Sequence, residues 1–297
     1  MRFADNTDLF VSLSGQFLVM TLPDPDSSTS GIPKSSTDGI LPHSAYNPCG
    51  RATIVFVHGA CSSRLEWDLV TPFLSQSYHL LIPDLPGHGQ SRNITPFSVE
   101  YSSRLLAKLI REKAIDGTAH VIGLSLGAHV GIDLASRYPQ VVNSMFVSGF
   151  EVFPQLALSP YLPYILWVMM RLENFIPRPV VRWLMDGADI KRVDKDVCTL
   201  ALCRQITNPL KTDRWPSPWP ARTLVVAAGK GGMIPSSDHP HDARKLVHIG
   251  NQLNSETMAL TQPWMRHPWN RQAPLLFAEI ARAWFEREEL PNEFQRL

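Results

Sequence analysis

Hydrophobic residues along the chain fall into short continuous runs that alternate with longer segments of helical spacing. Thr53–Val57 is an apolar, β-branched run, and Tyr78–Ile82 is a second run of this kind, as expected of strands buried on both faces of a sheet. Between the runs, apolar residues recur every three or four positions, which predicts helices. The pattern predicts strands at 53–57, 78–82, 120–122, 143–148, 223–228 and 255–260, with a further edge strand at 16–21. It predicts helices at 65–75, 98–113, 126–137, 239–253 and 272–288.

The regular exchange of strands and helices predicts a doubly wound α/β fold with a mostly parallel sheet and helices on both faces. The exchange stops over residues 151–220, where Leu, Met, Trp and Pro occur with helical spacing and without a strand. We therefore expect a core made of residues 1–150 and 221–297, with an inserted helical segment at 151–220. Residues 22–51 are rich in Pro, Ser, Gly and Asp, which indicates a linker.

Composition narrows the classes of function. Of 297 residues, 44% are hydrophobic and 19% are charged, which is typical of a chain with a sizeable core. The formal net charge is +1, and the basic residues are scattered, so a nucleic-acid partner is not expected. No window approaches the roughly 18 apolar residues of a membrane span, and residues 1–15 lack a secretory signal pattern, so we expect a cytoplasmic protein. No two cysteines share a C-x-x-C spacing, so neither a zinc nor a redox motif is expected.

The strongest chemical signal is Gly123-Leu124-Ser125-Leu126-Gly127, which matches G-x-S-x-G between a predicted strand and a predicted helix. In that context the turn is tight, and a side chain at either glycine would collide with a neighbouring element. The strained turn exposes Ser125 as a nucleophile. The helix that begins at Leu126 directs its first amides toward developing negative charge.

A second signal, His58-Gly59-Ala60, directly follows the strand predicted at 53–57. The His-Gly pair allows a sharp turn, after which a backbone N–H can point toward the nucleophile. The predicted oxyanion hole consists of the N–H groups of Ala60 and Leu126. Each such donor stabilises a tetrahedral oxyanion by about 3 kcal/mol.

These two motifs, with Asp84-Leu85-Pro86-Gly87-His88-Gly89-Gln90-Ser91 between them, resemble the α/β-hydrolase superfamily. The resemblance covers residues 53–148 well and 221–288 more loosely, and the sequence of residues 58–61 is similar to that of small ester-cleaving members. It implies a doubly wound sheet, a cap inserted after the sixth strand, and a Ser-His-acid triad. In such a protein His88 fixes a loop and does not act as a catalyst.

The resemblance also implies that the general base follows the last strand, where His267 is the matching residue. Its neighbours Arg266 and Pro268 depart from the family, which usually has Gly before the His. Histidines 239, 241 and 248 lie on or near a predicted helix and are more simply surface residues.

The acid of the triad is where the sequence departs most from the resemblance. Relatives place Asp shortly after the strand predicted at 223–228, but residues 229–235 here contain Gly at that place. Asp238 in the same loop is one candidate, although Asp before His-Pro is also a good helix N-cap. Glu151, after the strand at 143–148, is the other candidate, and the absence of any acid remains an open alternative.

The reaction that these residues predict is acyl transfer to Ser125 during cleavage of an ester, thioester or lactone, without a metal ion or organic cofactor. The inserted segment is expected to form a lid, and its large side chains either line a pocket for a hydrophobic small molecule or, for most of them, form the core of the lid itself. The large side chains concerned are Trp167, Met169, Met170, Trp183, Trp215 and Trp219. A lyase or cyclase on the same scaffold and a low-turnover ligand receptor remain alternatives, as do a monomer and a homodimer.

Overall fold

The computed structural model describes residues 39–152, 159–192, 194, 196–208, 215–231 and 236–297, together with the backbone of two short strands near the N-terminus. The chain divides into two units, Met1–Ser35 and Ser36–Leu297. In the first unit, β1 (Leu9–Leu13) pairs antiparallel with β2 (Gln16–Met20). The strand expected at 16–21 is therefore present, but it belongs to this hairpin and not to the edge of the main sheet. Residues 22–38 of the expected linker lie outside the described residues.

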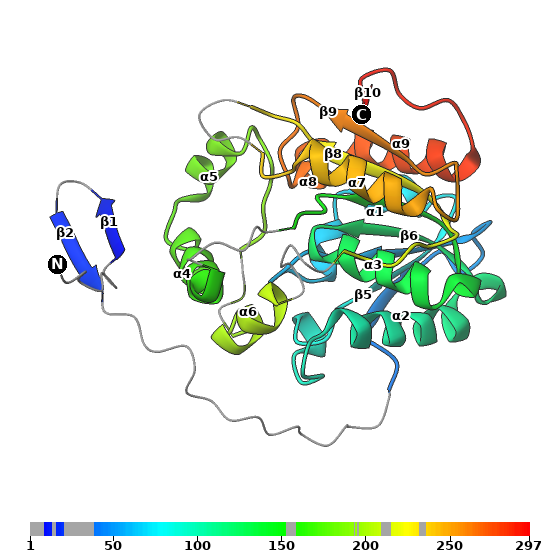
Figure 1. Cartoon of the computed structure of the whole chain (residues 1–297). Helices are drawn as coiled ribbons and strands as arrows, with labels where there is room; N and C mark the ends of the chain where they lie inside the picture. The colour runs from blue at the N-terminus through cyan, green and yellow to red at the C-terminus, as the bar shows by residue number, and fades with distance from the viewer. Residues whose placement is uncertain are drawn as a thin grey trace, which may run out of the picture. The chain divides into compact units, whose positions relative to one another are not determined.

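The second unit is built on an eight-stranded sheet with the order β10-β9-β8-β7-β6-β4-β5-β3 (Figure 1). Its six central strands run parallel, and the two edge strands, β3 and β10, are antiparallel to their neighbours. This arrangement confirms the doubly wound, mostly parallel sheet that the sequence predicts. The strands are β3 (His43–Tyr46), β4 (Thr53–Val57), β5 (His79–Pro83), β6 (Ala119–Leu124), β7 (Val142–Ser148), β8 (Arg222–Ala228), β9 (Met258–Gln262) and β10 (Gln295–Arg296).

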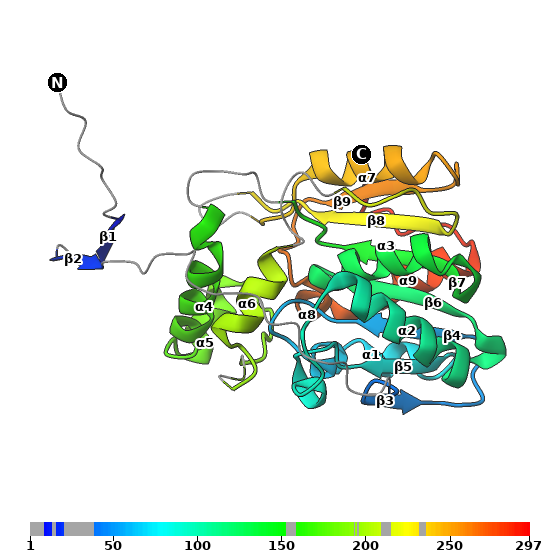
Figure 2. The same ribbon diagram turned by 60° about the horizontal axis from the view of Figure 1, so that its bottom comes forward.

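Helices cover both faces of this sheet (Figure 2). Alternate residues of β4 belong to two separate apolar clusters, Val55 and Val57 to one and Ile54 and Phe56 to the other. The first cluster continues into α2 (Val99–Lys113), α3 (Leu126–Arg137) and α7 (Pro240–Gly250), and the second into α1 (Thr71–Leu74), α8 (Trp269–Gln272) and α9 (Pro274–Glu286). The 3-10 helices are η1 (Arg64–Trp67), η2 (Gly89–Ser91), η3 (Ile115–Gly117), η4 (Pro139–Val141) and η5 (Ser159–Tyr161). Strands whose sequences are continuously apolar, without alternating polar residues, thus have both of their faces buried, as the pattern predicts.

Helix α2 illustrates how the local sequence sets an element. Ser98 lies just before the helix, and its hydroxyl accepts a hydrogen bond from the Tyr101 N–H, which satisfies one of the first free amides. The apolar face predicted from the spacing is fully buried, with Leu106, Leu109 and Ile110 at 0% exposure.

The inserted segment contributes α4 (Leu162–Glu173), α5 (Arg178–Leu184) and α6 (Leu200–Thr207) between β7 and β8, and these helices lie together at one end of the sheet (Figures 1 and 2). Five strands of the main sheet precede the segment in the described chain, so a position after the sixth strand is not confirmed. Helix α6 buries Leu202, Cys203 and Ile206, whereas α4 has no buried side chain.

Prolines explain why two predicted helices are divided, and edge positions explain why two strands were not predicted. The helix expected at 65–75 is divided into η1 and α1, with Pro72 in the first turn of α1, and the helix expected at 272–288 restarts at Pro274. Proline lacks the N–H that would continue a preceding helix but fits the first turn of a new one. The edge strands β3 and β10 were not predicted. Half or more of their residues are exposed, so they lack the apolar run that marks a central strand.

Candidate active site

The turn between β6 and α3 carries Ser125 in the conformation expected of an exposed nucleophile. Its backbone has φ 55° and ψ −118°, a region that non-glycine residues rarely occupy. A Cβ atom at Gly127 would lie 2.0 Å from the Val57 carbonyl oxygen, and one at Gly123 would lie 2.5 Å from the Gly127 oxygen. Both glycines are therefore required by close packing of the turn, as the sequence predicts.

The end of β7 brings Ser125 and His267 to the same place. The N–H of Ser125 donates a hydrogen bond of 2.8 Å to the carbonyl oxygen of Ser148, the last residue of β7. The next residue, Gly149, has φ +67°, and a Cβ atom there would lie 2.6 Å from Cε1 and 3.3 Å from Nε2 of His267. Two residues far apart in the sequence thus border the same short stretch of backbone. Sequence reasoning missed Gly149, whose only signal was its position after a predicted strand.

Asp238 lies against the imidazole of His267. Nδ1 of His267 is 2.5 Å from Oδ1 of Asp238, and Oδ2 of Asp238 accepts a 2.7 Å hydrogen bond from the N–H of Ala228, at the end of β8. The carboxylate is thereby held from both sides, and its side chain is only 2% exposed. Asp238 is not the N-cap of α7, because that position belongs to His239. Residues 232–235 of the loop before Asp238 lie outside the described residues.

Glu151, the other candidate acid, also lies beside the imidazole. Its Oε1 is 3.3 Å from Nδ1 of His267 but forms no hydrogen bond within the described residues. The carbonyl of Glu151 accepts a hydrogen bond of 3.0 Å from Nε2 of His129, a buried histidine on α3. The structure therefore brings both candidates to one nitrogen, and Asp238 has the shorter contact.

The two carboxylates control the charge of His267. Burial opposes protonation of the ring, but the negative charges of Asp238 and Glu151 and the hydrogen bond to Asp238 outweigh it, so the pKa of His267 lies well above its ordinary value. Burial alone would raise the pKa of Glu151, yet its interaction with His267 lowers it overall. Since a hydrogen bond to a carboxylate places a proton on Nδ1, the nitrogen left to exchange protons with a substrate is Nε2.

The loop after β4 is held by three hydrogen bonds. The buried His58 donates from Nδ1 to the Gly59 carbonyl at 2.8 Å and accepts at Nε2 from the Leu85 N–H at 3.0 Å. Burial lowers the pKa of His58 to about 4, so the ring is neutral, as this pairing requires. The N–H of Gly59 donates to Oε2 of Glu66 at 2.7 Å. Glu66 was missed from the sequence, because nothing in the residues around it marks a loop-binding carboxylate.

The two predicted oxyanion donors belong to segments that adjoin Ser125. A Cβ atom at Gly59 would lie 3.5 Å from Cβ of Ser125, so the loop that carries Ala60 approaches the serine closely. Leu126 is the first residue of α3. Among the described residues, none accepts a hydrogen bond from the N–H of Ala60 or Leu126.

The segment Asp84–Ser91 is held by hydrogen bonds next to the loop that follows β4. The Asp84 carboxylate accepts hydrogen bonds from the N–H groups of Arg64 and Gln90, at 2.7 and 2.9 Å. His88 is fully buried and bonds through Nδ1 to the carbonyl of Pro86 at 2.9 Å. These contacts agree with a loop-fixing role for His88.

The large side chains expected to line a pocket divide into three groups. Met169 and Trp183 are 59% and 78% exposed and project into solvent, so they do not line an enclosed pocket. Trp219 is fully buried in the core. The remaining three are partly buried and pack against the core, and they are Trp167, Met170 and Trp215.

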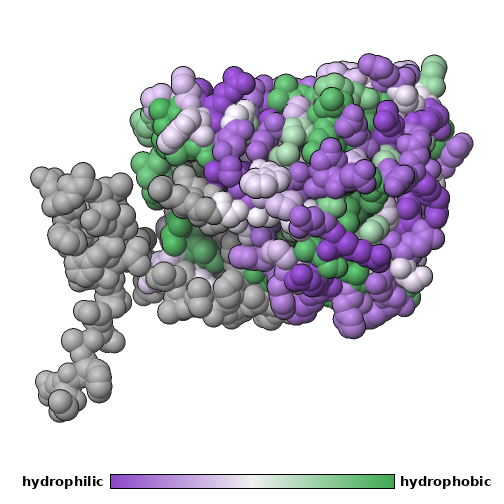
Figure 3. Space-filling model, turned by 90° about the horizontal axis from the view of Figure 1, so that it is seen from above, coloured by the Kyte–Doolittle hydropathy of each residue, from purple (hydrophilic) through white to green (hydrophobic). Residues whose placement is uncertain are grey.

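The inserted segment is also tied to the loops that carry the candidate acid and base. The carboxylate of Asp186 pairs with the guanidinium of Arg266 and lies 2.7 Å from Nζ of Lys230. Arg271, just after His267, pairs with Asp189 and with Asp68. Trp183 and Val180 of α5 are exposed. Figure 3 shows that hydrophobic and hydrophilic residues are mixed over the visible surface.

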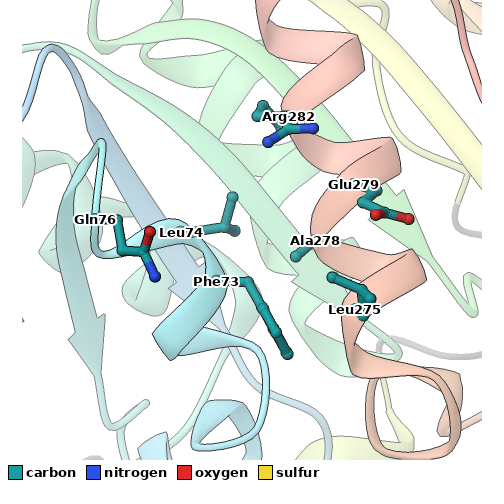
Figure 4. A pocket seen from close by; sticks show the side chains of 7 residues that line it. All are labelled: Phe73, Leu74, Gln76, Leu275, Ala278, Glu279 and Arg282. Carbon is teal, nitrogen blue, oxygen red and sulfur yellow. The ribbon is translucent and has the colours of Figure 1, made fainter.

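A separate surface depression lies between α1 and α9 (Figure 4). Its lining residues are Phe73, Leu74, Gln76, Leu275, Ala278, Glu279 and Arg282. It contains none of the predicted site residues.

Comparison with known proteins identifies the family. The model of the alpha/beta hydrolase family matches residues 54–283. The chain belongs to this family. This hydrolase is 36% identical, over 261 residues, to an AB hydrolase superfamily protein of Gibberella zeae, an alignment that covers 87% of the chain and 88% of that relative. It is thus an enzyme of the hydrolase class.

More distant relatives of the hydrolase include esterases. A pimeloyl-[acyl-carrier protein] methyl ester esterase of Aromatoleum aromaticum is 33% identical over 118 residues, which covers 38% of this chain and 44% of that protein. A thermophilic esterase from Thermogutta terrifontis has a similar fold, with a TM-score of 0.63 at 16% identity, over 83% of this chain and 93% of that one. Within the described residues, no helix is both long and apolar enough to cross a membrane.

Proposed function

We propose that this hydrolase cleaves the ester, thioester or lactone bond of a hydrophobic small molecule through an acyl-enzyme on Ser125. The observation that carries the proposal is the 2.5 Å contact between His267 and Asp238 beside the strand end that also holds Ser125. A nucleophile, a base and an acid that orients the base are the parts that acyl transfer requires.

In the proposed reaction, Oγ of Ser125 attacks the carbonyl carbon while Nε2 of His267 takes the hydroxyl proton. The N–H groups of Ala60 and Leu126 donate hydrogen bonds to the oxyanion of the tetrahedral intermediate. His267 then gives its proton to the leaving oxygen or sulfur. Water that loses a proton to His267 then attacks the acyl carbon. His267 returns that proton to Oγ as the acyl–Oγ bond breaks, which releases the acid and restores Ser125.

We assign Asp238 as the acid that orients His267, because its second oxygen is fixed by the Ala228 N–H and its side chain is buried. Glu151 serves as a second carboxylate that adds negative charge near the imidazole at 3.3 Å. Negative charge at this place stabilises the imidazolium that forms in the transition state.

The proposed substrate class follows from the surroundings of the site. Residues 151–220 act as a cap in this proposal, and Trp167, Met170 and Trp215 pack at the cap–core boundary. Apolar and aromatic side chains with few charges favour a hydrophobic acyl or alcohol group. The ester-cleaving relatives support an oxygen ester first among the three bond types.

A fluorophosphonate probe and a panel of p-nitrophenyl esters test the proposal together. We expect rapid, stoichiometric labelling of Ser125 and release of p-nitrophenol, with both lost in Ser125→Ala. Ser77→Ala removes an exposed hydroxyl outside the site and serves as the matched control. A chain that hydrolyses the esters with Ser125 replaced, or that resists the probe while binding the ester, would contradict the acyl-enzyme.

A further inference from the structure

Three of the four cysteines of the chain meet in the interior, and none of them is assigned above to the reaction. Sγ of Cys61 is 3.0 Å from Sγ of Cys198, which is 3.7 Å from Sγ of Cys203. All three sulfur atoms lie within 4.8 Å of one another. Their residues are between 0% and 3% exposed, whereas the fourth cysteine, Cys49, is exposed. We call this group the thiol cluster.

Local structure explains why the three sulfurs converge. Cys61 follows the loop after β4 and has φ 55°, a turn conformation that directs the chain away from the strand. Thr199 caps the start of α6 by accepting a hydrogen bond from the Leu202 N–H. Cys198 therefore lies just before the helix and Cys203 in its first turns. The core and the inserted segment each contribute to the cluster.

The chemistry of the cluster matches that of a soft metal ion. Three cysteine sulfurs are the donor set of Cys₃His zinc sites, in which thiolates bind at about 2.3 Å. Tetrahedral geometry at that bond length separates the sulfurs by about 3.8 Å. The separation of 3.7 Å already matches this value, and the separation of 3.0 Å reaches it by a shift of less than 1 Å.

A candidate fourth donor, His88, interacts electrostatically with Cys198. It does not belong to the group of atoms that lie within 4.8 Å of one another, so its ring has to move toward the sulfurs when a metal ion binds. His88 is fully buried, and its Nδ1 bonds to the Pro86 carbonyl, so the proton is on Nδ1 and the lone pair on Nε2. Nε2 has no hydrogen-bond partner within the described residues. A Cβ atom on the adjacent Gly87 would lie 2.8 Å from Cδ1 of Leu202, so this loop packs against α6. A buried nitrogen without a partner is costly unless it binds a ligand.

We propose that Cys61, Cys198 and Cys203 bind one thiophilic divalent cation of the zinc type, with Nε2 of His88 as the fourth donor. Binding releases the thiol protons to solvent and transfers no electrons. Four protein ligands leave no open position, so the ion is structural. It joins the loop that carries Ala60 to the inserted segment, and it would fix the position of that segment above the core.

The experiment uses the full chain, reduced and freed of metal, with Co²⁺ as the probe. We expect one equivalent of Co²⁺ to bind and to produce thiolate-to-cobalt charge-transfer absorption together with the intense visible bands of a tetrahedral site. Added Zn²⁺ should abolish both. Cys198→Ser should lose the charge-transfer band, whereas Cys49→Ser, which changes the exposed thiol, should keep it.

Thermal unfolding supplies a second readout that does not depend on colour. Equimolar Zn²⁺ should raise the Tm of the metal-free chain by about 3 °C or more, and this rise should vanish in Cys198→Ser. His88→Ala should keep thiolate binding but weaken it by at least tenfold. Cys203→Ala repeats the test if Cys198→Ser fails to fold.

Three outcomes would overturn the proposal. One is the absence of charge transfer in a chain whose four thiols all react after denaturation, which would make the cluster plain apolar packing. Another is a Cys61–Cys198 disulfide in the isolated protein, identified by peptide mapping. The last is Co²⁺ binding without thiolate absorption, which would place the ion at Glu151, Asp238 and His267, a second group with suitable spacing. Labelling of Ser125 is measured on the metal-free chain, where none of these outcomes affects it, so the two proposals fail separately.

Discussion

The core of the second unit and the inserted segment bury their hydrophobic residues very differently. Every residue of β4 and β5 is buried, and Trp269 of α8 and Phe277 of α9 have no exposed surface. In the insertion, α4 has no buried side chain, and α5 has only Val181. The close packing of the core thus fixes the conformations of its side chains. Substitutions in α4 and α5, whose side chains are mostly exposed, do not disturb this packing.

In the proposed mechanism, this difference assigns the chemistry to loops of the core and the choice of substrate to the insertion. The loops that carry Ser125, Asp238 and His267 all leave the ends of strands or the start of core helices, so rigid elements position them. Catalytic geometry tolerates errors of only about 0.5 Å, which favours such a location. The insertion touches this frame through the ion pairs of Asp186 and through α6, and is suited to choosing the substrate.

Among the substitutions that test this division between core and insertion, replacing the proposed nucleophile should have the largest effect on activity. Ser125→Ala should lower kcat/KM toward an activated ester by about 10⁴-fold or more, because it removes the atom that forms the acyl-enzyme. Stopped-flow and steady-state assays measure the loss. If a substitution in the insertion, such as Trp183→Ala, lowered kcat as strongly, the proposal that the core alone carries the chemistry would be contradicted.

Replacing the acid separates the two carboxylates beside His267. Asp238→Asn should lower kcat/KM by about 10³- to 10⁴-fold. The amide oxygen would accept from the Ala228 N–H, so the uncharged NH₂ would donate to Nδ1 and favour the wrong tautomer of His267. Glu151→Gln should cost less than about tenfold, since its contact is longer and forms no hydrogen bond. Equal losses in the two variants would assign the orienting role to the pair.

Truncating a core aromatic residue should destabilise the fold without a direct effect on chemistry. Phe146 of β7 has no exposed surface, and its ring centroid lies 4.8 Å from that of Phe277. Phe146→Ala should lower the free energy of unfolding by about 3–5 kcal/mol, measured by urea denaturation. A loss under about 1 kcal/mol would mean that the core on this face is loosely packed.

The pH profile tests the electrostatics of the core site. His267 must be neutral to accept a proton, and its raised pKa means that kcat/KM should climb with pH and reach half its limit above pH 6.5. Asp238→Asn removes the charge that raises this pKa, so the midpoint should move to lower pH. A wild-type midpoint below pH 6.5 would contradict the proposed pairing.

The same pKa shift links stability to pH. Because the pKa of His267 is raised in the folded state, its ion pairing stabilises the fold fully below the unfolded pKa, and that contribution disappears as pH rises through the folded pKa. The free energy of unfolding of the wild type should therefore decline relative to His267→Gln as the pH is raised above about 6.5.

The smallest expected effect is on the exposed face of the insertion. Trp183→Ala should change the free energy of unfolding by no more than about 0.5 kcal/mol, because 78% of the residue already contacts solvent. The matched core substitution is Trp269→Ala, which should cost about 3–5 kcal/mol. A loss above about 2 kcal/mol for Trp183→Ala would show that α5 is packed against another surface in solution.

Much of the fold was predictable because the central strands and helices carry strong local patterns. The strands β4 to β8 and the helices α2 and α3 lie within two residues of their predicted limits. The edge strands β3 and β10 were not predicted, since half-exposed edge residues have no characteristic pattern. The positions of Met169 and Trp183 were predicted wrongly, because helical spacing does not reveal which neighbour, if any, covers an apolar face.

The sequence by itself determined the parallel core, the tight turn at Ser125 and the candidate status of His267, because glycine spacing and continuous apolar runs are local properties of the chain. Only the tertiary structure decided that Asp238 and Glu151 reach the same nitrogen, that Glu66 holds the Gly59 amide, and that three cysteines without a motif converge. Such contacts join residues from separate elements, and their distances depend on how the sheet and helices pack.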